Sequence, residues 1–267
     1  MYLNLASYLF VDLEDLATLR QDILEAGASL SMRGTVLLAP EGINTFVCGQ
    51  PADARRFAAH LREQRGLEGL VFKESWSHGQ SFNRLLVKLK KEIITFRQAG
   101  CRPADGRAET VDAPTLAAWL DRGSDDEGRP VVMVDTRNAF ETQVGLFAGA
   151  IDPHLKSFTE LPQALERRRD DLAGKRIVTY CTGGIRCEKA ALYLDANGFE
   201  NVVQLEGGVL KYFEEVGARH WQGELFVFDR RVSLKPDLTP GTWEQDFSSR
   251  EIRPAARDAV PASDAAR

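Results

Sequence analysis

The sequence predicts an α/β chain of two domains, in which a ferredoxin-like α+β sandwich precedes a parallel sheet flanked by helices. Strand and helix patterns in the N-terminal part follow the order β-α-β-β-α-β, which is typical of the ferredoxin-like sandwich. Farther along, apolar strands alternate with helices, as in parallel sheets covered on both faces. A polar segment rich in turn formers separates these regions. We therefore expect a first domain at 1–97, a linker at 98–110, a second domain at 111–221 and a C-terminal extension at 222–267.

The first predicted strand runs from Asn4 to Val11, and Asp12 is a suitable N-cap for a following helix. Apolar residues then repeat at helical spacing, at Leu16, Leu19, Ile23 and Ala26. Gly27 stands where the residue just after a helix end is expected.

The next segment, GTVLLAPEGINTFVCG, holds two β-rich runs separated by Pro40, Glu41 and Gly42, which predicts a hairpin. A second helix begins near Pro51 and has one apolar face, formed by Ala54, Phe57, Ala58 and Leu61. Further strands are expected at Leu70–Ser75 and Leu85–Phe96.

The second domain should contain three apolar strands: Val131–Asp135, the RIVTY segment that ends at Tyr180, and Asn201–Leu205. Helices are expected around Thr115–Leu120, within 161–172, at Glu188–Asn197 and after Gly207 and Gly208. The last stretch, Arg250–Arg267, is dominated by Ala, Asp, Arg and Pro, and we expect it to be disordered.

The composition is ordinary for a soluble globular protein, with 43% hydrophobic and 27% charged residues. No apolar run approaches the ~20 residues of a membrane span, and the N-terminus lacks the basic region of a signal peptide. Four unevenly spaced cysteines do not form a disulfide framework, so we expect a protein of the reducing cytoplasm.

The net charge of −5 argues against nonspecific coating of nucleic acid. One local basic stretch contains a single acid, Glu92, among Arg84, Lys88, Lys90, Lys91 and Arg97. It is either the solvated face of a strand or a stripe that contacts phosphates.

The segment VTYCTGGIRCEKAALYL places Cys181 at the end of a parallel strand, where open α/β sheets bind their ligands. Gly183 and Gly184 allow the loop to curl, so that its amides converge beside the N-terminus of the next helix. These amides favour the thiolate of Cys181 over its thiol. The loop therefore suits a reactive sulfur.

Other interpretations fit the spacing less well. A zinc site needs about four ligands with short paired spacing, but Cys48 and Cys101 lie elsewhere and no histidine flanks the loop. A disulfide between Cys181 and Cys187 could form as a redox state but is not expected as a structural link. Cysteine-dependent phosphatases resemble Cys-x5-Arg, whereas Arg186 comes one position too early. The remaining interpretation is a loop whose cysteine carries sulfur as a persulfide.

The motif CTGGIR resembles the six-residue active loop of rhodanese domains, and VDTRNAFETQVGLFAGAI and LEGGVLKYFEEVG resemble other rhodanese segments. Together with GTVLLAPEGIN, FKESWSHGQSFNRLLVKLKKEI and GELFVFDRRV, these motifs resemble the tRNA uridine hydroxylase family over nearly all of residues 1–240. The resemblance implies an acylphosphatase-like or ferredoxin-like domain ahead of a rhodanese domain. It also implies oxygen-dependent conversion of the wobble uridine of tRNA to 5-hydroxyuridine, with O2 and an unidentified reductant as co-reactants.

Cys181 is the expected nucleophile and holder of a persulfide, within an active loop completed by Thr182, Gly183, Gly184, Ile185, Arg186 and Cys187. Cys187 either resolves a persulfide or is a small buried residue. Arg186 either adds positive potential at the loop mouth or forms a surface salt bridge. We expect no metal site.

For residues outside the loop we mostly expect structural roles. Asp135 and Arg137 should pair and tie a strand end to a neighbouring loop, Glu141 should stabilise a turn, and none of the four histidines has a partner at triad spacing. The EGIN turn and the lysines of the basic stretch make a better RNA-docking surface than a catalyst: Lys88, Lys90 and Lys91.

The leading hypothesis is therefore a tRNA-modifying oxidoreductase, with tRNA and a sulfur or electron donor protein as partners and no membrane. No cofactor that activates oxygen is evident in the sequence. The alternative enzyme is a sulfurtransferase that carries sulfane sulfur on Cys181, and a third hypothesis is a binding module whose cysteine senses oxidants. The first domain discriminates between them, because a plain sulfur carrier does not need it.

Overall fold

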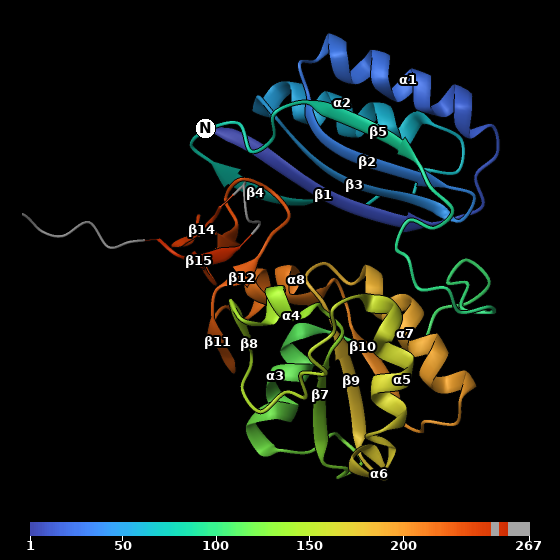
Figure 1. Ribbon diagram of the computed structural model, residues 1–267, viewed down its shortest axis with the longest axis vertical. Coiled ribbons are helices and arrows are strands. Elements are labelled where there is room, and N and C mark those ends of the chain that lie inside the picture. Colours follow the sequence, from blue (N-terminus) through green and yellow to red (C-terminus); the bar gives the residue numbers. More distant parts are fainter. Residues whose placement is uncertain (247–250, 256–267) are drawn as a thin grey trace, which may run out of the picture.

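The computed structural model describes residues 1–246 and 251–255. It consists of two α/β domains, one above the other in Figure 1, joined by a strand-poor segment on one side and by the C-terminal extension on the other. No helix in this part of the chain is long and apolar enough to cross a membrane.

The first domain has one five-stranded sheet in the order β4-β1-β3-β2-β5, with both of its helices on the face away from the second domain (Figure 1). Its elements are β1 (Tyr2–Phe10), α1 (Leu16–Ser29), β2 (Arg33–Ala39), β3 (Gly42–Gly49), α2 (Pro51–Glu63), β4 (Lys73–Ser77) and β5 (Leu85–Leu89). The first four strands have the predicted ferredoxin-like order, and β5 adds to the edge, parallel to β2. The predicted hairpin, β2 and β3, is confirmed, as is the buried face of α2.

Three details of the predicted first domain are wrong. The N-cap of α1 is Asp15, whose side chain accepts the amide of Thr18, and not Asp12. The helix continues through Gly27, because α1 packs so closely on β5 that a Cβ there would lie 2.3 Å from Leu85. The last strand ends at Leu89 instead of Phe96, since the chain then turns towards the second domain.

The second domain has a four-stranded, all-parallel sheet in the order β6-β10-β9-β7. Its elements are β6 (Thr110–Val111), α3 (Ala113–Arg122), β7 (Val131–Asp135), α4 (Ala139–Thr142), β8 (Gly145–Phe147), η1 (Phe158–Glu160), α5 (Leu161–Glu166), α6 (Arg169–Leu172), β9 (Arg176–Tyr180), α7 (Ile185–Ala196), β10 (Val202–Leu205) and α8 (Gly208–Glu215). The predicted parallel sheet is confirmed, although α7 begins three residues before the expected Glu188.

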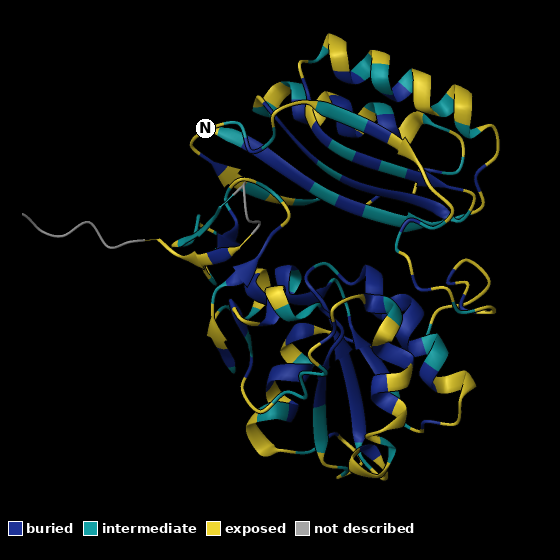
Figure 2. Cartoon of the chain, in the orientation of Figure 1, coloured by how far each residue is buried: buried dark blue, intermediate teal, exposed yellow. Residues whose placement is uncertain are grey.

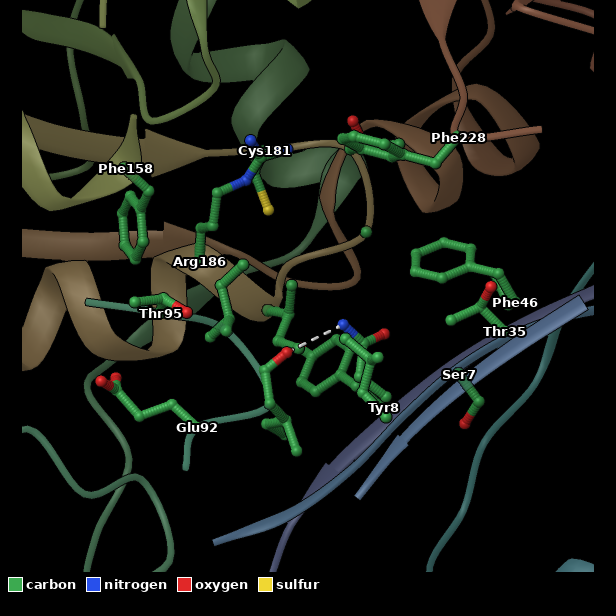
Figure 3. A pocket seen from close by; sticks show the side chains of 18 of the residues that line it. Ser7, Tyr8, Thr35, Phe46, Glu92, Thr95, Phe158, Cys181, Arg186 and Phe228 are labelled. Carbon is green, nitrogen blue, oxygen red and sulfur yellow. Dashed lines mark hydrogen bonds between the residues drawn. The ribbon is translucent and has the colours of Figure 1, made fainter. Parts of the chain in front are cut away.

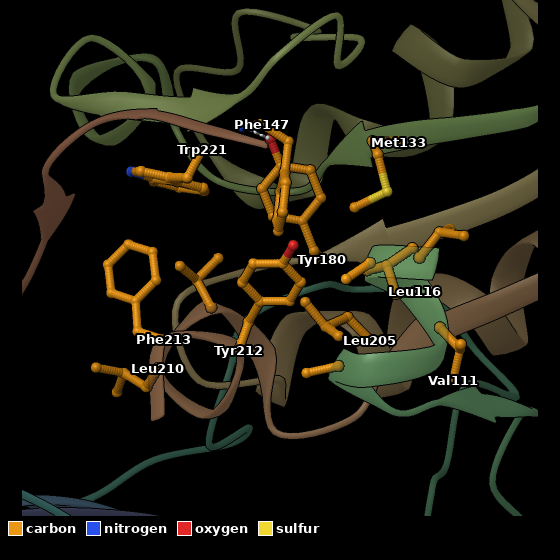
Figure 4. Packing of buried hydrophobic residues seen from close by; sticks show 14 of the residues in the cluster. Val111, Leu116, Met133, Phe147, Tyr180, Leu205, Leu210, Tyr212, Phe213 and Trp221 are labelled. Carbon is orange, nitrogen blue, oxygen red and sulfur yellow. Dashed lines mark hydrogen bonds between the residues drawn. The ribbon is translucent and has the colours of Figure 1, made fainter. Parts of the chain in front are cut away.

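Alternate residues of the central strand β9 enter two cores on opposite faces of this sheet. Val178 and Tyr180 join the cluster beneath α3 and α8, and Ile177 joins the cluster beneath α5 and α7. In the first cluster, the ring of Phe147 contacts three other aromatic rings edge to face at 4.9–5.1 Å (Figure 4): Tyr180, Tyr212 and Trp221. This packing fixes the end of β9, from which the active loop departs.

The segment expected to be a polar linker is attached to the second domain. Cys101 is buried in the core cluster that also contains Phe96, and Thr110 pairs with Gln204 at the edge of the parallel sheet. These contacts restrict how the two domains can move apart.

The C-terminal extension forms short strand pairs that lie between the domains and beside them (Figure 1). They are β11 (Trp221–Gly223) with β8, β12 (Leu225–Phe226) with β13 (Ser233–Leu234), and β14 (Trp243–Gln245) with β15 (Ile252–Pro254). The prediction of disorder from Arg250 onward is wrong for β15, because Ile252 is buried in a cluster with Phe226 and Trp243. Residues 247–250 and 256–267, on which the rest of that prediction falls, lie outside the described residues.

Candidate active site

The active loop connects β9 to α7 at the carboxyl edge of the parallel sheet. Cys181 leaves the strand, and the amide of Gly184 donates a 3.1 Å hydrogen bond to its Sγ. Gly184 has a φ of 101°, which favours glycine and turns this amide towards the sulfur. Because α7 begins at Ile185, Arg186 and Cys187 lie in its first turn.

The start of α8 holds the other side of the loop. The amides of Val209 and Leu210 donate 3.0 Å hydrogen bonds to the carbonyls of Cys181 and Thr182. A Cβ at Gly208 would lie 2.5 Å from the Cys181 carbonyl oxygen, so only glycine permits this approach. Gly207 and Gly208 have φ values of 71° and 67°, a backbone conformation that favours glycine.

The surroundings of Cys181 favour its thiolate. Burial alone would raise the pKa of this thiol, but the Cys187 thiol, the Arg186 charge and the amides of Arg186 and Gly184 lower it to about 5. Cys181 is therefore a thiolate at neutral pH, which is the nucleophilic form of the side chain. The side chain is fully buried but lines the cavity described below.

Cys187 behaves in the opposite way. Burial and the neighbouring Cys181 raise its pKa well above the ordinary value, so it remains a thiol and donates a hydrogen bond to the Cys181 sulfur. The Thr136 hydroxyl lies 3.7 Å from its sulfur. In this arrangement Cys187 is a buried hydrogen-bond donor to the nucleophile.

Arg186 lies in the interior rather than at the surface. Its guanidinium donates hydrogen bonds of 2.5 and 2.7 Å to both carboxylate oxygens of Glu141, which also accepts the amide of Asn138. The interpretation of Glu141 as a turn residue was incomplete, since this carboxylate also fixes Arg186. Within the described residues, Nε of Arg186 is buried without a hydrogen-bond partner.

Asp135 and Arg137 form the predicted ion pair. Both are fully buried, and Nη2 of Arg137 lies 2.6 Å from the Asp135 carboxylate and donates to the Gly145 carbonyl at 2.7 Å. The pair joins the end of β7 to the start of β8 and is structural.

The first domain covers the active loop with polar side chains. Lys73 donates a 3.1 Å hydrogen bond to the Gly183 carbonyl. The Tyr8 hydroxyl donates at 3.1 Å to Glu188, which also binds Arg107. These residues were missed in the sequence because they lie more than 70 positions from the loop.

A second set of contacts crosses the same interface. Lys189 of α7 donates to Glu41 and Glu92 and to the Ile94 carbonyl, at 2.8–3.1 Å. In the EGIN turn, Glu41 pairs with Lys189 and Asn44 is buried but lines the cavity described below. The turn as an RNA-docking surface stays a prediction. The motifs EGIN, FKES and CEKA each contain charged residues of this interface, but nothing in the sequence shows that they pair.

A cavity of about 450 Å³ lies between the sheet of the first domain and the active loop (Figure 3). Cys181 and Arg186 face it from the second domain, and its aromatic lining comes from both domains and the C-terminal extension: Tyr8, Phe46, Phe82, Phe158 and Phe228. Its lining also includes Asn44, Lys73, Lys90 and Asn138. The cavity has the size and lining of a site for a small aromatic group.

The loop residues predicted from the sequence lie together at this cavity, but the predicted lysines do not all reach it. Lys88, Lys90 and Lys91 are all exposed (Figure 2 maps the burial), and only Lys90 lines the cavity. Lys88 lies on β5 and pairs in register with Leu37, a residue of the cavity lining, and Lys90 follows the end of this strand. Across the described ranges, no cluster of His, Cys, Asp or Glu is arranged to hold a metal ion.

Comparison with known proteins agrees with this architecture. Residues 2–93 match the family described as UPF0176 acylphosphatase like domain, and residues 116–215 match the rhodanese-like domain family. A tRNA uridine(34) hydroxylase of Paraburkholderia xenovorans (strain LB400) is 54% identical over 93% of this chain and 88% of its own. Proteins of the same name from Paraburkholderia phytofirmans and Variovorax paradoxus are 52% and 55% identical, over 97% and 89% of this chain and 91% and 90% of theirs. The chain therefore belongs to the tRNA uridine(34) hydroxylase family, in which an acylphosphatase-like domain precedes a rhodanese domain.

Proposed function

We propose that this protein hydroxylates C5 of the uridine at position 34 of tRNA, with Cys181 as the nucleophile. The observation that carries the proposal is a buried thiolate facing an aromatic cavity of about 450 Å³ between two domains. The names of the relatives supply the reaction and the substrate. A plain sulfurtransferase needs the loop alone, whereas this cavity needs both domains.

The cavity suits a nucleobase that has left its stack. Enzymes that act on a base extrude it into a pocket and read it by stacking and hydrogen bonds. Five aromatic side chains line this cavity, and its lining also holds polar side chains, among them Asn44 and Asn138. Single-stranded loops such as an anticodon loop present bases in this way.

The Cys181 thiolate can activate C5 of uracil, which does not react with O2 on its own. Addition of the Cys181 sulfur to C6 of uracil makes C5 electron-rich, and elimination of the sulfur after oxidation restores the aromatic ring and the thiolate. The net reaction consumes O2, two electrons and two protons: one oxygen atom enters the C5 hydroxyl and the other leaves as water. We propose a thiol-type reductant as the source of the electrons, and O2 as the oxidant.

For RNA docking we propose the exposed lysines beside the cavity. Lys88 lies on the edge strand β5 and Lys90 just after its end, where phosphates of the anticodon loop would pass while its base occupies the cavity.

Mass spectrometry of tRNA nucleosides tests the proposal. Cells that lack the gene should lose 5-hydroxyuridine and its derivatives, and the wild-type gene should restore them while Cys181→Ser does not. Purified protein with tRNA, O2 and dithiothreitol should form the product with one oxygen atom from ¹⁸O2. An unchanged nucleoside profile in the deletion strain would refute the proposal and favour sulfur transfer.

A further inference from the structure

Lys73 lies on β4 of the first domain, yet its ammonium contacts the catalytic loop of the second. Nζ donates a 3.1 Å hydrogen bond to the Gly183 carbonyl and lies 5.5 Å from the centre of the Tyr8 ring. Both of these partners are neutral. Among the described residues, no carboxylate forms an ion pair with this ammonium.

Lys73 is partly buried, and this absence sets it apart from the buried cations of the site. Arg137, Arg186 and Lys189 each contact a carboxylate. A cation removed from water without a counter-charge is costly, and such groups are normally paired. Burial lowers the pKa of Lys73, and Cys181 is the foremost of the anions that oppose this effect.

The remaining charges around the loop largely cancel in pairs. Glu141 pairs with Arg186, whose charge also acts on Cys181, and Arg107 pairs with Glu188. Charged and titratable groups near the loop also come from the elements packed around it: Cys187 on α7, Tyr8 on β1, Asp135 on β7, and Lys211 and Glu214 on α8. Lys73 is thus a positive charge next to the loop that forms no ion pair within the described residues, although the charges of Cys181, Glu214 and Glu188 act on it.

We propose that Lys73 is a positioning residue whose ammonium is the counter-charge of the Cys181 thiolate, so that the first domain completes the nucleophile of the second. The first domain then has an electrostatic part in the reaction besides any contact with RNA. This inference concerns the free enzyme and does not depend on the substrate.

The test is a titration of Cys181 in the purified, full-length protein. The ultraviolet absorbance of its thiolate is followed against pH, and the titration of Cys181→Ser is subtracted as background. Lys73→Met and Lys73→Gln should raise the pKa of Cys181 by about one unit, the size expected when a nearby opposite charge is lost. Lys73→Arg keeps the charge and should titrate like wild type, as should Lys88→Gln, which removes an exposed lysine from the same domain.

The glutamine variant separates charge from hydrogen bonding. Its amide can still donate to the Gly183 carbonyl but carries no charge. A wild-type pKa in Lys73→Gln would show that only the hydrogen bond matters and would overturn the proposal, and so would a raised pKa in Lys73→Arg. Thermal unfolding of each variant confirms that the domains remain folded, and no RNA is needed for any of these measurements.

Discussion

Arg186 and Glu141 form a bidentate ion pair, with N–O distances of 2.5 and 2.7 Å, and both side chains are buried. Burial alone would raise the pKa of Glu141, but the Arg186 guanidinium holds it below its usual value. The carboxylate thus fixes the arginine whose charge favours the Cys181 thiolate.

Loss of the Glu141 charge should destabilise the protein strongly. Glu141→Gln leaves the Arg186 charge buried without compensation, a change that typically costs about 3 to 5 kcal/mol. Glu166→Gln is the control, because its pair with Arg169 is half-exposed and exposed pairs contribute at most about 1 kcal/mol. Urea unfolding measures both variants, and equal losses of stability would contradict the assignment.

The reactivity of Cys181 should depend on pH unlike that of an ordinary thiol. Because its pKa is lowered to about 5, the thiolate predominates above that pH and is protonated as the pH falls below it. Alkylation of Cys181 by iodoacetamide, measured on its peptide by mass spectrometry, should be nearly constant from about pH 6 to 8 and should decline below about 5. A rate that still climbs through pH 8 would show an unperturbed thiol.

Replacement of Cys187 should weaken the nucleophile. Cys187→Ala removes the thiol that donates to the Cys181 sulfur, so the acidic limb of the alkylation profile should move up by about one pH unit. Cys101→Ala, which removes another buried thiol, should leave it in place. If Cys187→Ala kept the wild-type profile but stopped after one turnover of tRNA, Cys187 would instead be a resolving thiol.

Phe228 should contribute to RNA binding. It lines the cavity and is 45% exposed, and stacking of a base on an aromatic ring is worth about 1 to 3 kcal/mol. Phe228→Ala should therefore weaken binding of an anticodon stem-loop by roughly 5- to 150-fold. Trp76→Ala is the matched control, since Trp76 is 38% exposed but does not line this cavity. Equal effects of the two substitutions would show that Phe228 does not stack on the base.

The lysines beside the cavity should govern how binding depends on salt. Reversal of charge at Lys88, Lys90 and Lys91 should weaken tRNA binding and should reduce the salt slope by about 0.7 for each lost contact with single-stranded RNA. The control reverses three exposed arginines that do not line the cavity: Arg56, Arg65 and Arg168. Unchanged affinity and slope in the lysine variant would place the RNA elsewhere.

Much of the architecture could be predicted because it depends on local patterns. The alternation of β9 and the apolar face of α2 follow directly from periodicity, and the loop of Cys181 and Gly184 follows from its glycines and its place after a strand. Helix ends were less predictable. Gly27 has the residue type of a helix end, but close packing against Leu85 requires glycine inside the helix.

The site residues that could not be predicted from the sequence are those brought together by contact between distant segments. Nothing near Tyr8 or Lys73 indicates that these residues face a cysteine 108 or more positions away. Likewise, Arg186 looks like a surface residue at a helix start until Glu141 is seen beside it. Such pairings depend on how two domains pack, which periodicity and spacing do not encode.

The order of the covering groups along the chain has a consequence for biosynthesis. Tyr8, Glu41, Lys73 and Glu92 all precede Cys181, and N-terminal domains generally fold first as a chain leaves the ribosome. The first domain is thus already folded when Cys181 leaves the ribosome. The Cys181 thiolate is therefore exposed to solvent only while the second domain folds.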